Sequence, residues 1–161
     1  MGRDMLRMLV SDIGIELGHI DTLLSELAIA IRTESPLARR SMGSILHDFY
    51  TCCERIFRRI AVEMNGGLEE TEQWHKTLLY RMTIPVEGVR PPVLSEELAA
   101  ELDEYLAFRH VFRNIYGFEL KGDRIIRLSE RLPEVAGRLK DEIAAFRKLL
   151  EKELDGSSFG P

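Results

Sequence analysis

The chain has 161 residues, of which 45% are hydrophobic and 30% charged, and its formal net charge is −5 at pH 7. This length suits one domain with a buried core, and this balance of residues is typical of a globular rather than a disordered protein. The negative charge argues against a protein that coats nucleic acid without selectivity, although it leaves room for a local basic cleft. Charges interrupt every apolar run before it reaches the length of a membrane span, so no membrane segment is expected.

The N-terminal segment and the two cysteines both favour a cytoplasmic protein. Asp4 and Asp12 interrupt a stretch that otherwise begins like a signal peptide, so we recognise no export signal. Cys52 and Cys53 are neighbours within an apolar periodic stretch, where adjacent helical side chains diverge. We interpret them as small core residues in a reducing compartment.

The first half of the chain is predicted to form two long helices, because apolar residues recur there at intervals of three or four. The first helix carries its apolar stripe from Leu6 to Ile31. Ser35 is expected to cap the second helix, with Pro36 at its first helical position. Asn65-Gly66-Gly67 is expected to end the second helix.

A shorter helix is predicted over about residues 70–82. Residues 82–93 contain three prolines and are interpreted as a rigid loop. Ser95 is then expected to cap a fourth helix, since two glutamates follow it and complement the helix dipole. The apolar stripe of this helix continues to Tyr116, and Gly117 is expected to end it.

The last element is predicted as a long helix that begins at Pro133 and runs to about Leu154, after a short turn capped by Asp123. Residues 155–161 are expected to form a flexible tail. The predicted fold is therefore all-α: an antiparallel four- to five-helix up-and-down bundle in which residues 1–154 form a single domain.

The stretch FRHVFRNIYGF, residues 108–118, places an arginine on the apolar stripe of the fourth helix. With about 100° of rotation per residue, Arg109, Arg113 and Tyr116 lie within about 60° of one another. Asn114 points about 140° away from Arg109. Cations, an amide and a phenol therefore gather in the last turns of one helix.

Two interpretations of Arg109 remain open. An unpaired buried guanidinium costs several kcal/mol, so Arg109 either pairs with an internal carboxylate or faces a wet cleft. Asp48 and Glu54 are the plausible partners for a structural pair, and they would also support a site. The functional interpretation is an anion site, because two forked cations one turn apart suit a phosphate group and its developing charge.

The same stretch, within an all-helical chain of this length, resembles the HEPN superfamily and its HepT-like branch. Those proteins carry Arg-x4-His-x-Tyr near the end of a bundle helix. On this sequence Arg109 takes the place of the motif Arg, Asn114 that of the His and Tyr116 that of the Tyr.

The resemblance implies a metal-independent endoribonuclease without a cofactor, often the toxin of a toxin–antitoxin pair. It implies a homodimer that pools both motif copies around RNA. It also implies an antitoxin partner, a small MNT-type nucleotidyltransferase that adenylylates the motif tyrosine. By this resemblance Tyr116 would be the modification site, and the added anion would block the RNA phosphate.

The sequence departs from the motif where proton transfer is needed. RNA cleavage without a metal requires deprotonation of the 2′-hydroxyl and protonation of the leaving 5′-oxygen. Histidine can do both near neutral pH, whereas Asn114 can only form hydrogen bonds. His110 is the histidine left in the motif, with Arg109 and Arg113 as phosphate clamps. The alternative is a non-catalytic binding module of the same fold, the substrate of a nucleotidyltransferase.

A metal-binding helical bundle is the third hypothesis. Glu16-x-x-His19 and Glu72-x-x-His75 have the spacing with which ferritin-like bundles hold two metal ions, but chance pairs are expected among so many glutamates. His47-Asp48 with Glu54 could form a further metal or catalytic cluster, and a solvated helical face is the plainer interpretation. No Gly-rich phosphate loop or zinc-knuckle spacing occurs in the sequence. The resemblance to the HepT-like branch implies a site without a metal.

Overall fold

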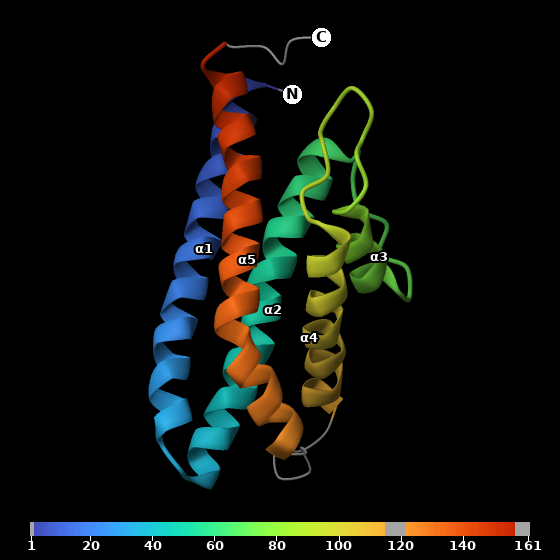
Figure 1. The fold of residues 1–161 in the computed structure, drawn as a ribbon. Helices are drawn as coiled ribbons and strands as arrows, with labels where there is room; N and C mark the ends of the chain where they lie inside the picture. The colour runs from blue at the N-terminus through green and yellow to red at the C-terminus, as the bar shows by residue number, and fades with distance from the viewer. Residues whose placement is uncertain (1, 115–121, 157–161) are drawn as a thin grey trace.

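The computed structural model describes residues 2–114 and 122–156. Four long helices run in alternating directions along the chain, and a short helix packs beside two of them (Figure 1). The elements are α1 (Arg3–Arg32), α2 (Pro36–Met64), α3 (Trp74–Arg81), α4 (Glu96–Asn114) and α5 (Gly122–Leu154). The predicted all-α bundle is thereby confirmed. None of the described helices combines the length and the apolar character that crossing a lipid bilayer requires.

The turn between α1 and α2 forms as the sequence predicts. Ser35 has an extended backbone, and its side chain accepts a hydrogen bond of 3.1 Å from the backbone N–H of Ala38. Pro36 occupies the first helical position, where the absence of an N–H leaves no hydrogen bond unmade. At the opposite end of the bundle, Nη2 of Arg3 donates to the carbonyl oxygen of Leu154, which ties the start of α1 to the end of α5.

The core lies between α2 and the helices that surround it. Phe49 of α2 and Tyr105 of α4 are both fully buried, and their rings meet edge to face with centroids 5.4 Å apart. Tyr105 donates its hydroxyl to the carbonyl oxygen of Leu128 in α5 at 2.9 Å. A buried phenol usually finds such a partner, because an unpaired hydroxyl in the core is costly. These contacts fix the position of α4 between α2 and α5.

Helix α3 and the loop after it differ in detail from the prediction. The helix begins at Trp74, later than expected, while Leu78 and Met82 are buried as their spacing predicts. Within the loop, Arg90 is only 5% exposed, which the sequence did not indicate. Its guanidinium donates to Oδ1 of Asn65 and to backbone carbonyls on both sides of the loop, and burial lowers its pKa. Arg90 thus binds the proline-rich loop to the end of α2.

Helix α5 corrects one prediction. It begins at Gly122 rather than at Pro133, and the proline lies inside the helix. Leu128 and Leu132 before the proline and Val135 after it are all buried on one stripe, so burial of this face outweighs the missing N–H. In Figure 1 the first turns of α5 slant toward α4 before the helix straightens. A proline-associated bend explains this change of direction.

Candidate functional site at the end of helix α4

Arg109 lies inside the bundle, where the apolar stripe of α4 places it. Its side chain is 3% exposed, and its Nη2 lies 2.8 Å from Oε2 of Glu54 on α2. Glu54 is itself buried. Of the two interpretations that the sequence left open, the structure therefore contains the internal ion pair, and Glu54 rather than Asp48 is the partner. A buried guanidinium needs such an acceptor, since its desolvation is otherwise uncompensated.

Glu54 also receives a histidine from α3. Nδ1 of His75 lies 2.7 Å from the same Oε2, and Nη2 of Arg109 lies 3.2 Å from that Nδ1. Because a carboxylate can only accept, Nδ1 of His75 carries the proton and donates to Glu54. The two donors therefore share one carboxylate oxygen rather than bonding to each other. This cluster joins α2, α3 and α4 at one point.

The remaining surroundings of Arg109 are also internal. The Arg109 guanidinium carbon lies 4.8 Å from the centre of the Tyr50 ring, a cation–π distance, and Nη1 lies 3.5 Å from Oγ1 of Thr51. Burial raises the pKa of Tyr50 well above its usual value, and the nearby Cys53 and Glu54 add to this, whereas Arg109 opposes it. The phenol beneath Arg109 therefore stays neutral at physiological pH.

Arg113, one turn further along α4, has a different environment. It is exposed, and its Nε donates to Nε2 of His47 on α2 at 3.2 Å. Nδ1 of the same histidine lies 3.0 Å from Oδ1 of Asp48. The imidazole also contacts the ring of Phe112, with centroids 5.4 Å apart, so its position is held by packing as well.

These contacts define the tautomer of His47. Nε2 accepts from Arg113, so Nδ1 carries the proton and donates to the carboxylate of Asp48. The arrangement is a carboxylate that orients an imidazole whose basic nitrogen faces a guanidinium. The His47 side chain is 21% exposed, and that of Asp48 is 54% exposed, so the group is open to solvent. Such a group can accept a proton beside a site that attracts an anion.

The other motif residues lie on or beyond the last turn of α4. His110 is exposed and does not point into the core. Asn114 is the last residue of α4, and its side chain lies outside what the structure describes. Tyr116 also lies outside the described residues. The predicted roles of Asn114 and Tyr116 therefore stay predictions.

A model of the family described as HepT-like protein matches residues 41–150, which is more than half of the chain. The chain belongs to the HepT-like family. The resemblance that the sequence predicts is thereby confirmed for the family, whereas the details of the motif are not tested. No curated protein and no solved structure matches the chain.

The matched segment of this HepT-like chain contains the contacts of Arg109 and Arg113 with α2 and α3. It begins early in α2 and ends late in α5, so α1 lies outside it. Within it, His47 and His75 are two histidines that the sequence alone does not connect with Arg109 and Arg113. Spacing alone pairs His75 with Glu72, but its carboxylate partner is Glu54, which is 21 residues away in sequence. Arg109 and Arg113 thus lie in different environments: Arg109 is buried, and Arg113 is open to solvent.

Among the described residues, the potential metal-ligating side chains do not form a ferritin-like pair of sites. Within residues 2–114 and 122–156, the one group of three or more potential metal ligands is Glu16, His19 and Cys52, and it includes neither Glu72 nor His75. Burial raises the pKa of Cys52 to about 12, and the charge of Glu16 adds to this. The two Glu-x-x-His pairs therefore do not come together around one cluster.

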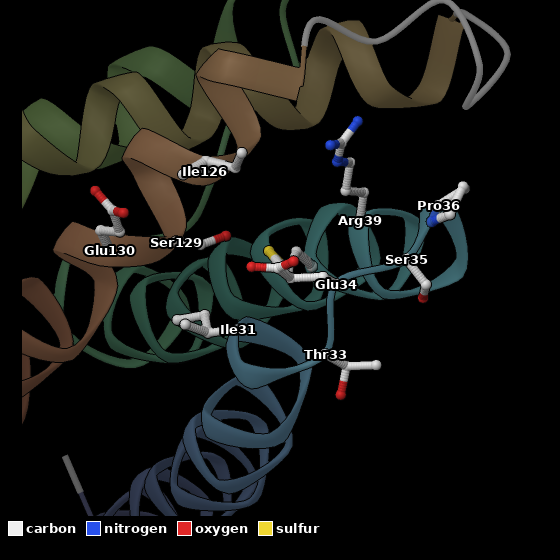
Figure 2. A pocket seen from close by; sticks show the side chains of 10 residues that line it. Ile31, Thr33, Glu34, Ser35, Pro36, Arg39, Ile126, Ser129 and Glu130 are labelled. Carbon is white, nitrogen blue, oxygen red and sulfur yellow. The ribbon is translucent and has the colours of Figure 1, made fainter.

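A hollow of about 550 Å³ lies at the end of the bundle where α4 ends, between the α1–α2 turn and α5 (Figure 2). Arg39 stands at one side of it, and Glu34 and Glu130 contribute carboxylates. Two carboxylates against one guanidinium do not favour a phosphate. Neither Arg109 nor Arg113 lines this hollow, so it is separate from the candidate site.

Proposed function

We propose that this HepT-like protein is a metal-independent endoribonuclease of a toxin–antitoxin pair. The observation that carries the proposal is the exposed contact of Arg113 with His47, whose imidazole is oriented by Asp48. In the family motif a histidine stands where this chain has Asn114. His47 supports the reaction by bringing a proton-transfer group to Arg113 from the neighbouring helix α2.

The proposed reaction needs no metal. When RNA binds, the Nε–H of Arg113 turns from Nε2 of His47 to a phosphate oxygen, which frees the lone pair of Nε2. Nε2 then takes the proton from the 2′-hydroxyl, and the resulting oxygen attacks the adjacent phosphorus. Arg113 stabilises the charge on the pentavalent phosphorane, and His110 returns a proton to the leaving 5′-oxygen. The products are a 2′,3′-cyclic phosphate and a 5′-hydroxyl. Arg113 binds the phosphate as a forked donor, which suits two non-bridging oxygens.

Arg109 acts as a positioning residue in this proposal. Its guanidinium is occupied by Glu54, and its 3% exposure leaves no surface for direct contact with RNA. Since Arg109 and Arg113 are one turn apart, the buried pair fixes the height and rotation of α4 against α2. Thr51 and Glu54 of α2 lie on the same helix as His47, so the pair also sets where Arg113 meets His47.

The proposed assembly is a homodimer in which both copies of the site face one RNA. A protomer with a net charge of −5 contributes one exposed motif arginine among the described residues, and two copies would double the positive charge in the cleft. The proposed antitoxin is an MNT-type nucleotidyltransferase that adenylylates Tyr116. Intact-mass analysis after incubation with that enzyme and ATP should reveal one added adenylate, which Tyr116→Phe abolishes. Label on another residue would refute this assignment.

Cleavage of single-stranded RNA in excess EDTA tests the catalytic proposal. Arg113→Ala is expected to reduce the rate by at least about 100-fold, because one preorganised donor to the transition state is lost. Arg7→Ala is the matched control, since Arg7 is also exposed but lies near the start of α1, at the opposite end of the bundle. Equal rates for the two variants would exclude Arg113 from the site.

A second candidate function is a non-catalytic module that binds the nucleotidyltransferase. It is favoured by Asn114 at the proton-transfer position and by the internal pairing of Arg109. In that case the wild-type protein would cleave no RNA in EDTA, while adenylylation of Tyr116 would still proceed. The two assays together therefore distinguish the two functions.

A further inference from the structure

Three side chains with different ligand chemistry converge between α1 and α2. Glu16 and His19 project from α1, and Cys52 projects from α2. One ligand atom from each, a carboxylate oxygen, a ring nitrogen and the sulfur, lies within 4.8 Å of the others. Nδ1 of His19 is 3.2 Å from Oε2 of Glu16. This cluster is not part of the site at the end of α4.

We propose that Glu16, His19 and Cys52 bind one Zn²⁺ ion or a similar transition-metal ion. Thiolate, imidazole and carboxylate are the three donor types that Zn²⁺ uses in proteins. Mg²⁺ and Ca²⁺ prefer oxygen ligands throughout, so the sulfur and the ring nitrogen select against them. The site is distinct from the proposed ribonuclease function and does not rest on it, because two of its ligands lie on α1, outside the matched segment.

The distances permit closure around an ion. In a tetrahedral site with bonds of about 2.0–2.3 Å, ligand atoms lie about 3.3–3.8 Å apart. The side chains must therefore approach by about 1 Å from their largest separation. His19 is 54% exposed at its side chain and can rotate to make this adjustment, whereas buried Cys52 provides a fixed point.

A neighbouring arginine supports rather than blocks the site. Nη1 of Arg55 lies 3.8 Å from Oε1 of Glu16, while Oε2 faces His19. One carboxylate oxygen is thus engaged by Arg55, and the other remains for the metal. With Zn²⁺ bound to one carboxylate and one thiolate, the centre has no net charge and does not repel the guanidinium. Arg55 then orients the ligand as an outer-shell partner.

A hollow of about 320 Å³ lies beside the three side chains. Its walls are formed by two of the three ligands, His19 and Cys52, together with Leu23, Asp48, Thr51 and Arg55. A water molecule fits the fourth position there and completes the tetrahedron. On coordination the Cys52 thiol loses its proton to bulk water, and a metal–sulfur bond replaces the S–H bond. The ion would connect α1 to α2 across this surface.

Titration of the full-length, EDTA-treated and desalted protein with Co²⁺ tests the site. One equivalent should produce the thiolate-to-cobalt charge-transfer band in the near ultraviolet, and one equivalent of Zn²⁺ should displace it. Cys52→Ser should abolish the band, and His19→Gln should weaken Co²⁺ binding by more than about tenfold. His19 is exposed, so this second variant keeps the fold even if Cys52→Ser does not.

Two variants serve as controls. Cys53→Ala removes the neighbouring thiol, and Glu26→Gln removes an exposed carboxylate from α1. Both should keep the band. Saturating Zn²⁺ at about 100 times Kd should also raise the Tm of the wild type by about 5–10 °C. Absence of the band in the wild type, or an unchanged affinity in His19→Gln, would overturn the proposal. Loss of ribonuclease activity in EDTA would not bear on it, so the two proposals fail separately.

Discussion

Arg109 and Glu54 form a buried ion pair between α4 and α2, with Nη2 and Oε2 2.8 Å apart. Glu54 also accepts from His75 of α3 through the same oxygen. A single carboxylate oxygen thus neutralises the guanidinium in the core and connects three helices. The arginine that the motif places first is therefore a structural partner of α2, while Arg113 meets solvent one turn later.

Breaking this pair is predicted to destabilise the protein strongly. Arg109→Ala leaves Glu54 buried without its cation, and the free energy of unfolding should fall by about 3–5 kcal/mol. Urea unfolding followed by far-UV circular dichroism measures this change. Arg113→Ala is the control on the same helix, and its effect should stay within about 0.5 kcal/mol because that side chain is exposed. Equal effects of the two variants would contradict the structural role of Arg109.

Replacing both partners together should be less damaging than replacing either alone. Arg109→Met with Glu54→Leu removes both charges and fills the space with apolar side chains, so no buried charge remains unpaired. We expect the double variant to be more stable than Arg109→Met by at least about 1 kcal/mol. The same urea titration provides the comparison. Strictly additive losses in the double variant would mean that the two side chains do not interact.

Tyr105 should make stability depend on pH in the alkaline range. Burial raises the pKa of Tyr105 above its usual value of 10.0, and its hydroxyl donates to Leu128 at 2.9 Å. The folded state therefore holds the phenol proton more tightly than the unfolded state. This contribution to stability is fully present below pH 10 and is lost as the pH rises above 10.

Tyr105→Phe tests this sign directly. At neutral pH the variant should be less stable by about 0.5–1.5 kcal/mol, because the hydrogen bond is missing. Above pH 10 the wild type loses the contribution of the Tyr105 phenol to its free energy of unfolding, whereas the variant has no phenol to lose. The difference in stability between the two proteins should therefore shrink. Tyr80→Phe is the control, since Tyr80 is 41% exposed. At about pH 11, roughly one unit above the usual pKa of tyrosine, the unfolded state has lost the phenol proton. A stability difference between wild type and Tyr105→Phe that stays constant up to this pH would show that unfolding does not release the proton of Tyr105.

The sequence predicts local features of the fold well, because the forces that determine them act over a few residues. Ser35 and Pro36 define the start of α2, and Leu78 and Met82 are buried as their spacing indicates. Pro133 is the exception, since a rule about local backbone geometry is outweighed there by burial of the whole apolar face of α5. The helix continues through Pro133 because its apolar face is buried against the neighbouring helices.

The candidate site is harder to predict because its partners are distant in sequence. Asp48 and Glu54 were both acceptable acceptors for Arg109, and only packing distinguishes them. His75 could be paired with Glu72 by spacing alone, whereas the fold brings it to Glu54. The contact of Arg113 with His47 spans 66 residues. A helical pattern gives the face on which a residue lies but not which helix covers that face.

The rate at which His47→Gln cleaves single-stranded RNA in excess EDTA, relative to wild type, tests the proposed ribonuclease mechanism most directly. Glutamine keeps a hydrogen-bonding side chain near Arg113 but cannot transfer a proton. We expect the wild type to cleave RNA and the variant to be slower by about 10²–10⁴-fold, with an unchanged circular dichroism spectrum. A variant that cleaves as fast as the wild type would contradict this mechanism, and so would a wild type that requires added metal.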